Sequence, residues 1–174
     1  MKRFLIVLTG LLVLGSCKEA PKSESKPKTH DLKLVHQMVG RLNDVVIYEI
    51  FAPPVASRIY AYSTLALYEA SKGMDSSYKS ITAKLNGFPA MPVPEPGKSI
   101  DFSVAGTNAV FAVREKFTFT KDSYRITRDK ILAEMQAGMD KELFDRSLAY
   151  GKAVADSIIK RAATDHYKEN LGMP

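Results

Sequence analysis

Hydrophobic residues recur every three or four positions along most of the chain, and this spacing is typical of one face of an α-helix. The clearest stripe comes late in the chain, and its members are Phe144, Leu148, Gly151, Ala155, Ile158 and Ala162. The pattern predicts long helices over residues 31–51, 53–73, 100–115, 121–138 and 140–163, with a shorter helical segment over 77–85. Because no βαβ pattern and no internal repeat accompanies them, we expect an all-α fold, a bundle of about five helices.

The residues between these segments suit helix ends and connections. Pro53 and Pro54 fit a first helical turn, where a missing N–H costs nothing. Thr120 and Asp140 are expected to cap the helices that follow them. Residues 86–99 contain four prolines and two glycines, which indicates an extended connection.

Two short stretches are not assigned to helices. Residues 117–120, FTFT, alternate as a strand does, but we interpret them as a loop whose phenylalanines Phe117 and Phe119 fill the core. The last ten residues, DHYKENLGMP, are polar and are predicted to form no element, and residues 168–174 are treated as a tail. In the preceding helix, Gly151 leaves room for another helix to approach closely.

The first residues of the chain are typical of an export signal. Lys2 and Arg3 precede an apolar run of about eleven residues, which is shorter than the roughly 20 that a spanning helix needs. The run ends in LGSC, which resembles the lipobox of bacterial lipoproteins. That resemblance implies that residues 1–17 are a lipoprotein signal peptide, cleaved before Cys17, and that Cys17 carries fatty acyl chains such as palmitate.

A short polar segment separates Cys17 from the helical body. Residues 18–29 contain two prolines and alternating charge, with no aliphatic residue larger than Ala. Such a composition cannot bury enough surface to offset ordering, so we expect a flexible tether ahead of a body over residues 30–167. Lys18 follows Cys17 where inner-membrane lipoproteins of enterobacteria carry Asp. The expected location is therefore the bacterial cell envelope, at the outer membrane, with the membrane as a partner through the lipid on Cys17.

Charge and cysteine content exclude several classes of function. The formal net charge is +6, but Lys2 and Arg3 contribute +2, residues 18–29 contribute another +2, and the body carries the remaining +2. No cluster of basic and aromatic residues is present, so we expect no nucleic-acid partner. Cys17 is the only cysteine, and once lipidated it leaves no thiol for disulfides, metal or nucleophilic chemistry.

The histidines do not form a metal-ligand pattern. His30 and His36 are six residues apart and so lie about 240° apart around a helix, on different faces. His166 stands alone in the polar end of the chain. We therefore predict no metal site.

The charged and aromatic residues of the 53–73 helix form a second group of candidates. Arg58 and Glu69 share a face but lie roughly 16 Å apart along the axis, so each is expected to meet a charge on another helix. Arg58 is a candidate contact for an ion-pair partner or for an anion. The tyrosines of this helix, Tyr60, Tyr62 and Tyr68, are interpreted as core residues with hydrogen-bonded hydroxyls.

Two segments resemble one known superfamily. PPVASRIYAYSTLALYEASKGMDSSY, residues 53–78, is similar to a segment near the N-terminus of vanadium-dependent haloperoxidases and their relatives among the type 2 phosphatidic acid phosphatases. GKAVADSIIKRAATDHY, residues 151–167, resembles a later segment of the same proteins. The resemblance implies an all-α bundle that binds phosphate or vanadate, and an enzyme of the haloperoxidase or acid phosphatase class.

The catalytic motifs of that superfamily are absent from this chain. Neither Arg-Pro nor Pro-Ser-Gly-His occurs, and the only Ser-Arg pair, Ser57-Arg58, is followed by Thr64 and Tyr68 where the family has its histidine and aspartate. No catalytic residue is carried over. Vanadate or phosphate would need a missing C-terminal half, so no cofactor is expected in this chain, and whether it belongs to an enzyme stays open.

Three hypotheses follow. The first is the N-terminal scaffold half of a haloperoxidase-like or phosphatase-like envelope lipoprotein, inactive alone, with apolar surface left open on its long helices for a C-terminal half or another helical partner. The alternative is a complete small outer-membrane lipoprotein that acts as a helical binding or interaction module, with closed packing. The third is an enzyme complete in itself.

Overall fold

The computed structural model describes residues 32–171. Its long helices are α2 (Leu32–Tyr48), α3 (Pro53–Ser71), α4 (Phe102–Phe117), α5 (Lys121–Gln136) and α6 (Lys141–Ala162), followed by the short α7 (Tyr167–Leu171). Two 3-10 turns, η1 (Lys72–Met74) and η2 (Thr82–Lys84), interrupt the long connection between α3 and α4. Residues 32–171 contain no strand, which confirms the all-α prediction. The proposed signal peptide and tether lie outside the described residues.

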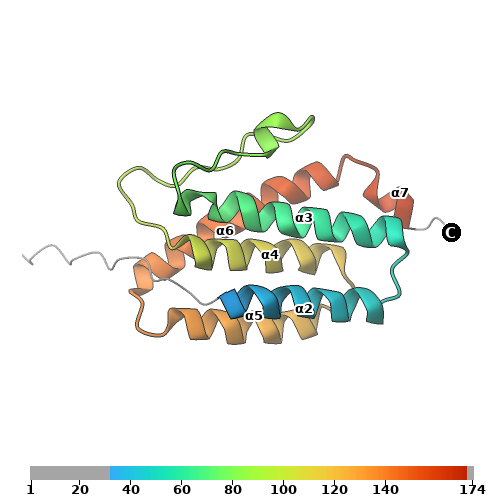
Figure 1. The fold of residues 1–174 in the computed structure, drawn as a ribbon, viewed down its shortest axis with the longest axis horizontal. Helices are drawn as coiled ribbons and strands as arrows, with labels where there is room; N and C mark the ends of the chain where they lie inside the picture. The colour runs from blue at the N-terminus through green and yellow to red at the C-terminus, as the bar shows by residue number, and fades with distance from the viewer. Residues whose placement is uncertain (1–31, 172–174) are drawn as a thin grey trace, which may run out of the picture.

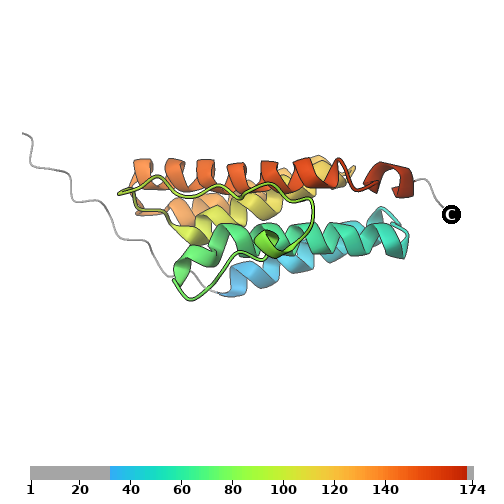
Figure 2. The same ribbon diagram turned by 90° about the horizontal axis from the view of Figure 1, so that it is seen from above.

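Helix α4 lies in the middle of the five long helices, with α3 and α6 on one side of it and α2 and α5 on the other (Figure 1). Figures 1 and 2 show α3, α4 and α6 packed side by side, with α2 and α5 together along one side of the molecule. The connection over residues 72–101, called the strap below, runs along the opposite side, outside α3 and α6. In the described part of the chain, no helix is both long and apolar enough to cross a bilayer.

The contact between α4 and α6 is close enough to require a glycine. A Cβ atom placed on Gly151 of α6 would lie 2.2 Å from the backbone oxygen of Ala105 in α4, so no side chain fits there. Gly106, the next residue of α4, faces the other neighbour, and its Cβ would lie 3.0 Å from Leu67 of α3. Small residues therefore let α4 approach both helices, as expected for Gly151 from the sequence.

The same packing supplies α3 with partners from its own chain. Its buried face includes Val55, Ile59, Ala66 and Ala70. These residues join one hydrophobic core with the buried residues of α4 and α6. The open apolar surface expected on the long helices is limited to a few side chains in α2 and α5, namely Val39, Ile47, Tyr48 and Ile126.

The helix caps follow the sequence only in part. Asp140 caps α6 as predicted, because its carboxylate accepts hydrogen bonds from the N–H groups of Glu142 and Leu143. Thr120 holds the N-cap position of α5, but its side chain makes no capping bond. A carboxylate distant in sequence, that of Glu49, accepts from the Thr120 N–H at 2.5 Å instead.

Three expectations for the connections are wrong. Phe117 is buried, but Phe119 is 68% exposed and does not fill the core. The 77–85 segment forms only the short η2 turn. The polar C-terminal stretch contains α7, and Tyr167 is buried there because its hydroxyl donates to the Phe117 carbonyl at 3.3 Å and its ring packs against Phe117.

Substituting Gly151→Ala tests the close approach of α4 and α6. The added methyl group would clash with the Ala105 backbone, which cannot rotate away as a side chain can, so we expect a loss of about 2 kcal/mol in the free energy of unfolding. The measurement is the urea midpoint. The matched control is Gly40→Ala in α2, where a Cβ meets nothing within 4 Å. Higher helix propensity should stabilise that variant by up to about 1 kcal/mol. Equal midpoints for the two variants would contradict the packing described.

Candidate functional site

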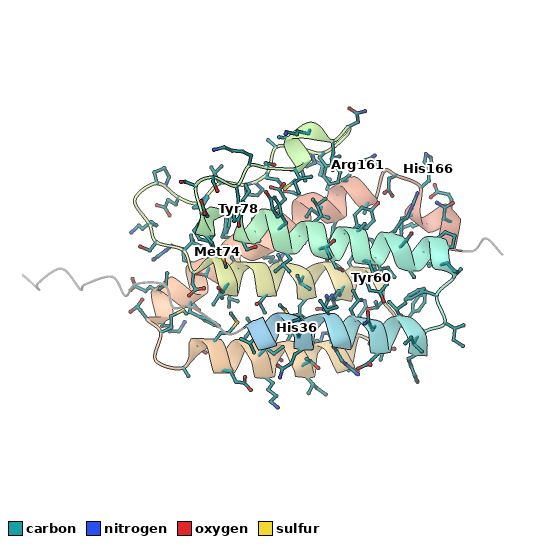
Figure 3. The ribbon with its side chains drawn as sticks, viewed as in Figure 1. His36, Tyr60, Met74, Tyr78, Arg161 and His166 are labelled. Carbon is teal, nitrogen blue, oxygen red and sulfur yellow. The ribbon has the colours of Figure 1, made fainter. Side chains whose placement is uncertain are left out.

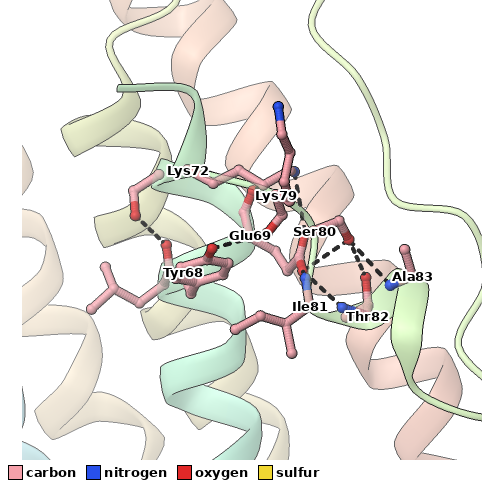
Figure 4. A network of polar contacts seen from close by, with 10 residues as sticks. Tyr68, Glu69, Lys72, Lys79, Ser80, Ile81, Thr82 and Ala83 are labelled. Atoms are coloured by element: carbon pink, nitrogen blue, oxygen red, sulfur yellow. Dashed lines mark hydrogen bonds and ion pairs between the residues drawn. The ribbon is translucent and has the colours of Figure 1, made fainter. Parts of the chain in front are cut away.

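A buried polar group with four polar contacts is the carboxylate of Glu69, near the C-terminal end of α3. Its side chain is fully buried. One oxygen, Oε1, accepts hydrogen bonds from the Ser80 hydroxyl at 3.0 Å, the Ile81 N–H at 2.7 Å and the Thr82 N–H at 3.0 Å. The Lys72 ammonium lies 3.2 Å from the other oxygen, Oε2. Figure 4 shows how these contacts hold the strap against α3.

The hydrogen bonds decide the charge of this buried group. Burial alone would raise the pKa of the Glu69 carboxyl, but bonds from the Thr82 N–H, Lys72 and Ser80 outweigh it and hold the pKa below its usual range. Glu69 is therefore a carboxylate at neutral pH. The sequence predicted a charge on another helix as its partner, and this is wrong: the cation comes from Lys72, three residues later in the chain. No sequence pattern indicated that backbone N–H groups of the strap would donate hydrogen bonds to Glu69.

The other charged candidate of α3, Arg58, contacts the turn between α6 and α7. Its guanidinium donates to the Asp165 carbonyl at 3.1 Å and lies 3.5 Å from the Asp165 carboxylate. The same carboxylate accepts from the Tyr167 N–H at 3.2 Å. In this arrangement Arg58 ties α3 to the start of α7. A role for Arg58 as an anion contact stays a prediction.

A second arginine, which sequence reasoning did not single out, is buried in the core. Arg114 of α4 is 2% exposed, and it donates to the Met38 carbonyl of α2 at 2.5 Å. Burial lowers the pKa of Arg114 to about 10, which leaves it protonated at neutral pH. The neighbouring hydroxyl of Tyr124, on α5, is buried without a hydrogen-bond partner among the described residues, and its pKa is raised by burial. This cation joins α4 to α2, and it is not among the residues that line the groove between α2 and α5 described below.

The described histidines lie apart from these groups. His36 is exposed on α2, and His166 is exposed beyond the end of α6, where its Nδ1 atom lies 3.4 Å from Glu169. Figure 3 shows the two on separate elements. Residues 32–171 contain no group of three His, Cys, Asp or Glu side chains that could hold a metal ion. His30 and Cys17 lie outside the described residues.

The tyrosines of α3 are placed only in part as the sequence indicated, because Tyr62 is a core residue whereas Tyr60 and Tyr68 are half-buried. Tyr62 is buried and stacks on Phe117 with ring centroids 5.4 Å apart. The half-buried Tyr60 donates to Asn43 at 2.8 Å, and Tyr68 donates to the Lys79 carbonyl of the strap at 2.9 Å. These hydroxyls bind groups of the protein and do not converge on a common space.

A shallow groove runs between α2 and α5. Its volume is about 410 Å3, and charges of both signs line it, Arg41 and Lys130 with Asp44 and Glu134. Mixed charge of this kind does not concentrate positive potential as a phosphate or vanadate site requires. With Ile126 and Ile131 also in its lining, the groove offers a mixed apolar and charged surface and no oxyanion pocket.

Comparison with known proteins supports the fold. No family model matches the chain, and no curated protein does either. The crystal structure of a bacterial vanadium-dependent iodoperoxidase is similar, with a TM-score of 0.75 and 32% sequence identity over 86% of this chain. This chain spans 37% of the length of that iodoperoxidase. It therefore shares its helical fold with part of a vanadium haloperoxidase, as the sequence resemblance implied.

Glu69→Gln tests the carboxylate that holds the strap. The folded-state pKa lies below the unfolded value of about 4.3, so Glu69 stabilises the protein above that pH, and the contribution is lost as pH falls through the folded-state value. At neutral pH we expect the variant to lose about 2 kcal/mol in the free energy of unfolding. The difference from the unsubstituted protein should shrink in acid.

The measurement is urea unfolding at several pH values, with Glu134→Gln as the control because Glu134 is exposed on α5. A Glu69→Gln effect that is equally large at neutral and acid pH would show that charge on this side chain is not what holds the strap.

Proposed function

We propose that this chain is the N-terminal helical scaffold portion of a vanadium haloperoxidase-like or phosphatidic acid phosphatase-like lipoprotein, and that it is inactive alone. The observation that carries the proposal is the likeness to the iodoperoxidase, which extends over 86% of this chain at 32% identity. The two sequence segments that resemble the superfamily, residues 53–78 and 151–167, contain all of α3 and the C-terminal half of α6, which pack together. Both therefore belong to the central packing unit of the fold.

The described residues do not fit a vanadate or phosphate group. Holding such an oxyanion takes several cationic donors that converge, and the chemistry of the superfamily needs a histidine beside them. Among residues 32–171, Arg58 is engaged by Asp165 and Arg114 is buried against the Met38 carbonyl, and the contacts of neither include a histidine. The proposed role is thus to support a pocket that other residues would form, with a C-terminal half as the partner.

Membrane attachment is the second part of the proposal. The lipobox resemblance at residues 14–17 supports acylation of Cys17 and anchoring in the cell envelope, at the outer membrane. Each buried methylene of an acyl chain contributes about 0.8 kcal/mol to membrane binding, so a multiply acylated Cys17 needs no spanning helix.

A specific observation favours the alternative of a helical binding or interaction module. The described residues enclose a single hydrophobic core, and α7 covers one end of it with the buried ring of Tyr167. Closed packing is what a module that works without a second half requires. The genomic reading frame beyond the Pro174 codon distinguishes the two: a frame that encodes Pro-Ser-Gly-His supports the scaffold, and its absence supports the module.

Cys17→Ser tests the lipid anchor. Without a thiol at residue 17 no acyl chain can be attached, so we expect the protein to accumulate as an unprocessed or soluble form when cells are fractionated. The control is Ser16→Ala, which leaves Cys17 in place. If the Cys17→Ser protein is acylated and fractionates as the original does, it is not a lipoprotein anchored at this residue.

A turnover assay tests the scaffold role. We expect purified residues 18–174, which include the whole described domain, to show neither phosphatase activity nor halide oxidation with vanadate and hydrogen peroxide. The physical reason is the lack of converging cations and histidine described above. Activity that exceeds a buffer control and follows the folded protein through purification would refute the proposal.

A further inference from the structure

The end of α2 carries an isoleucine in a backbone conformation that favours glycine. The Ile50 N–H bonds to the Ile47 carbonyl at 3.2 Å, and the Phe51 N–H bonds to the Val46 carbonyl at 3.3 Å. These two bonds define a Schellman motif, in which the residue at the position of Ile50 adopts a left-handed conformation and is usually glycine. Ile50 has φ of 51°, a value that a β-branched residue rarely adopts.

Packing within the chain does not explain this choice of residue. The Ile50 side chain is 88% exposed, so it gains almost nothing from the core in return for its backbone strain. Glycine would form the same turn without strain. An exposed, strained, large apolar side chain is therefore explained better by a contact outside the chain.

Ile50 belongs to an exposed apolar cluster. We call Ile47, Tyr48, Ile50 and Phe119 the apolar knob; their side chains are 75%, 76%, 88% and 68% exposed. Figure 1 shows that the two connections that carry the knob, α2 to α3 and α4 to α5, lie at the same end of the bundle. The knob thus projects from one end of the molecule (Figure 1), and none of its four residues lines the groove between α2 and α5.

The knob is held in place by the residues between its members. The Glu49 carboxylate accepts hydrogen bonds from the Phe119 N–H at 3.0 Å and the Thr120 N–H at 2.5 Å. The Phe119 ring packs against Phe51 with centroids 5.6 Å apart. These contacts join the two connections, so the apolar side chains are presented together without having to be ordered on binding.

The surrounding charges match an anionic lipid surface. Lys116 and Lys121 flank the α4–α5 connection, and both are exposed and form no ion pair with another described residue. Of the nearby acidic groups, Glu49 is occupied by N–H donors, and Asp122 lies 3.5 Å from Arg125. Aromatic and aliphatic side chains flanked by lysines are the residues that lie at the membrane interface.

The position of Cys17 is compatible with contact between the knob and the membrane. The helix α2 separates residue 32 from the knob by about 26 Å at 1.5 Å per residue. Fourteen residues lie between Cys17 and Leu32, and a chain of that length spans at most about 50 Å. Lipid on Cys17 and the knob can therefore reach one membrane surface together.

We propose that the apolar knob is a membrane-contact site, which inserts between the headgroups of an anionic lipid surface. If Cys17 is acylated as proposed above, the knob and the acyl chains enter the same membrane. The affinity of the knob for lipid does not depend on that acylation. Insertion of the knob would orient the domain so that this end of the helical bundle faces the membrane.

The absence of tryptophan from the chain allows a direct test. In purified residues 18–174, which hold the entire described core and lack Cys17, Tyr48→Trp places a single reporter in the knob, and Tyr78→Trp places one on the strap, at the far end of α3 (Figure 3). Circular dichroism checks that both proteins are folded. With phosphatidylglycerol vesicles we expect the Tyr48→Trp emission to shift to the blue and the Tyr78→Trp emission to stay unchanged.

Ile50→Gly then separates binding from stability. We expect it to weaken vesicle binding by about tenfold, because a large apolar side chain is removed. The thermal midpoint should stay unchanged or rise, because glycine relieves the backbone strain.

The proposal would be overturned if vesicles caused no shift of the Tyr48→Trp emission, or if Ile50→Gly left vesicle binding unchanged. It would also be overturned if the same shift appeared without vesicles, on raising the protein concentration or adding a polypeptide. The last would assign the knob to a second copy or to a protein partner. Since Cys17 is absent from the protein tested, failure here would leave the lipid-anchor proposal to its own experiment.

Discussion

The backbone contact between α4 and α6 is the constraint on which the rest of the structure depends. With Gly151 against the Ala105 carbonyl, the two helices approach as closely as their main chains allow. Such close packing removes α4 from water on nearly all sides, and its buried residues are mostly Ala, Val and Gly. The remaining helices pack around this pair, α3 through Gly106 and α5 along the other side of α4.

Two buried or half-buried glutamates fix the connections that this core does not hold. Glu69 accepts two backbone N–H groups from the strap, and Glu49 accepts two from the α4–α5 connection. In each case a carboxylate accepts hydrogen bonds from backbone N–H groups that have no partner within a helix. An irregular segment packed against the core needs such acceptors. The consequences differ. The hydrogen bonds to Glu69 hold the strap over the core, whereas those to Glu49 hold a connection whose apolar side chains face outward.

Sequence reasoning found the features that depend on local chemistry. Helical periodicity located the five long helices, a small residue at 151 indicated close approach, and Asp140 was recognised as a cap from its own side chain. It missed the contacts that depend on folding. The cap of α5 comes from Glu49, 71 residues away, and the donors to Glu69 come from the strap, so neither pairing has a short-range pattern.

The same distinction applies to function. The absence of Arg-Pro and Pro-Ser-Gly-His can be read directly from the chain. The structure adds the partners of two arginines, Asp165 for Arg58 and the Met38 carbonyl for Arg114. The knob could not be recognised from the sequence, because an isoleucine at the end of an amphipathic helix is as compatible with burial as with exposure. Only the φ of Ile50 and its 88% exposure show that the position is unusual.

Native-state hydrogen exchange tests the central role of the α4–α6 contact most directly. If this contact supports the rest, the slowest amides will lie in α4 and α6 and will exchange only through global unfolding, while those of α2, α5 and the strap open at lower free energy. Amides of α4 and α6 that exchange by local opening, while α2 or α5 remains protected, would contradict the account.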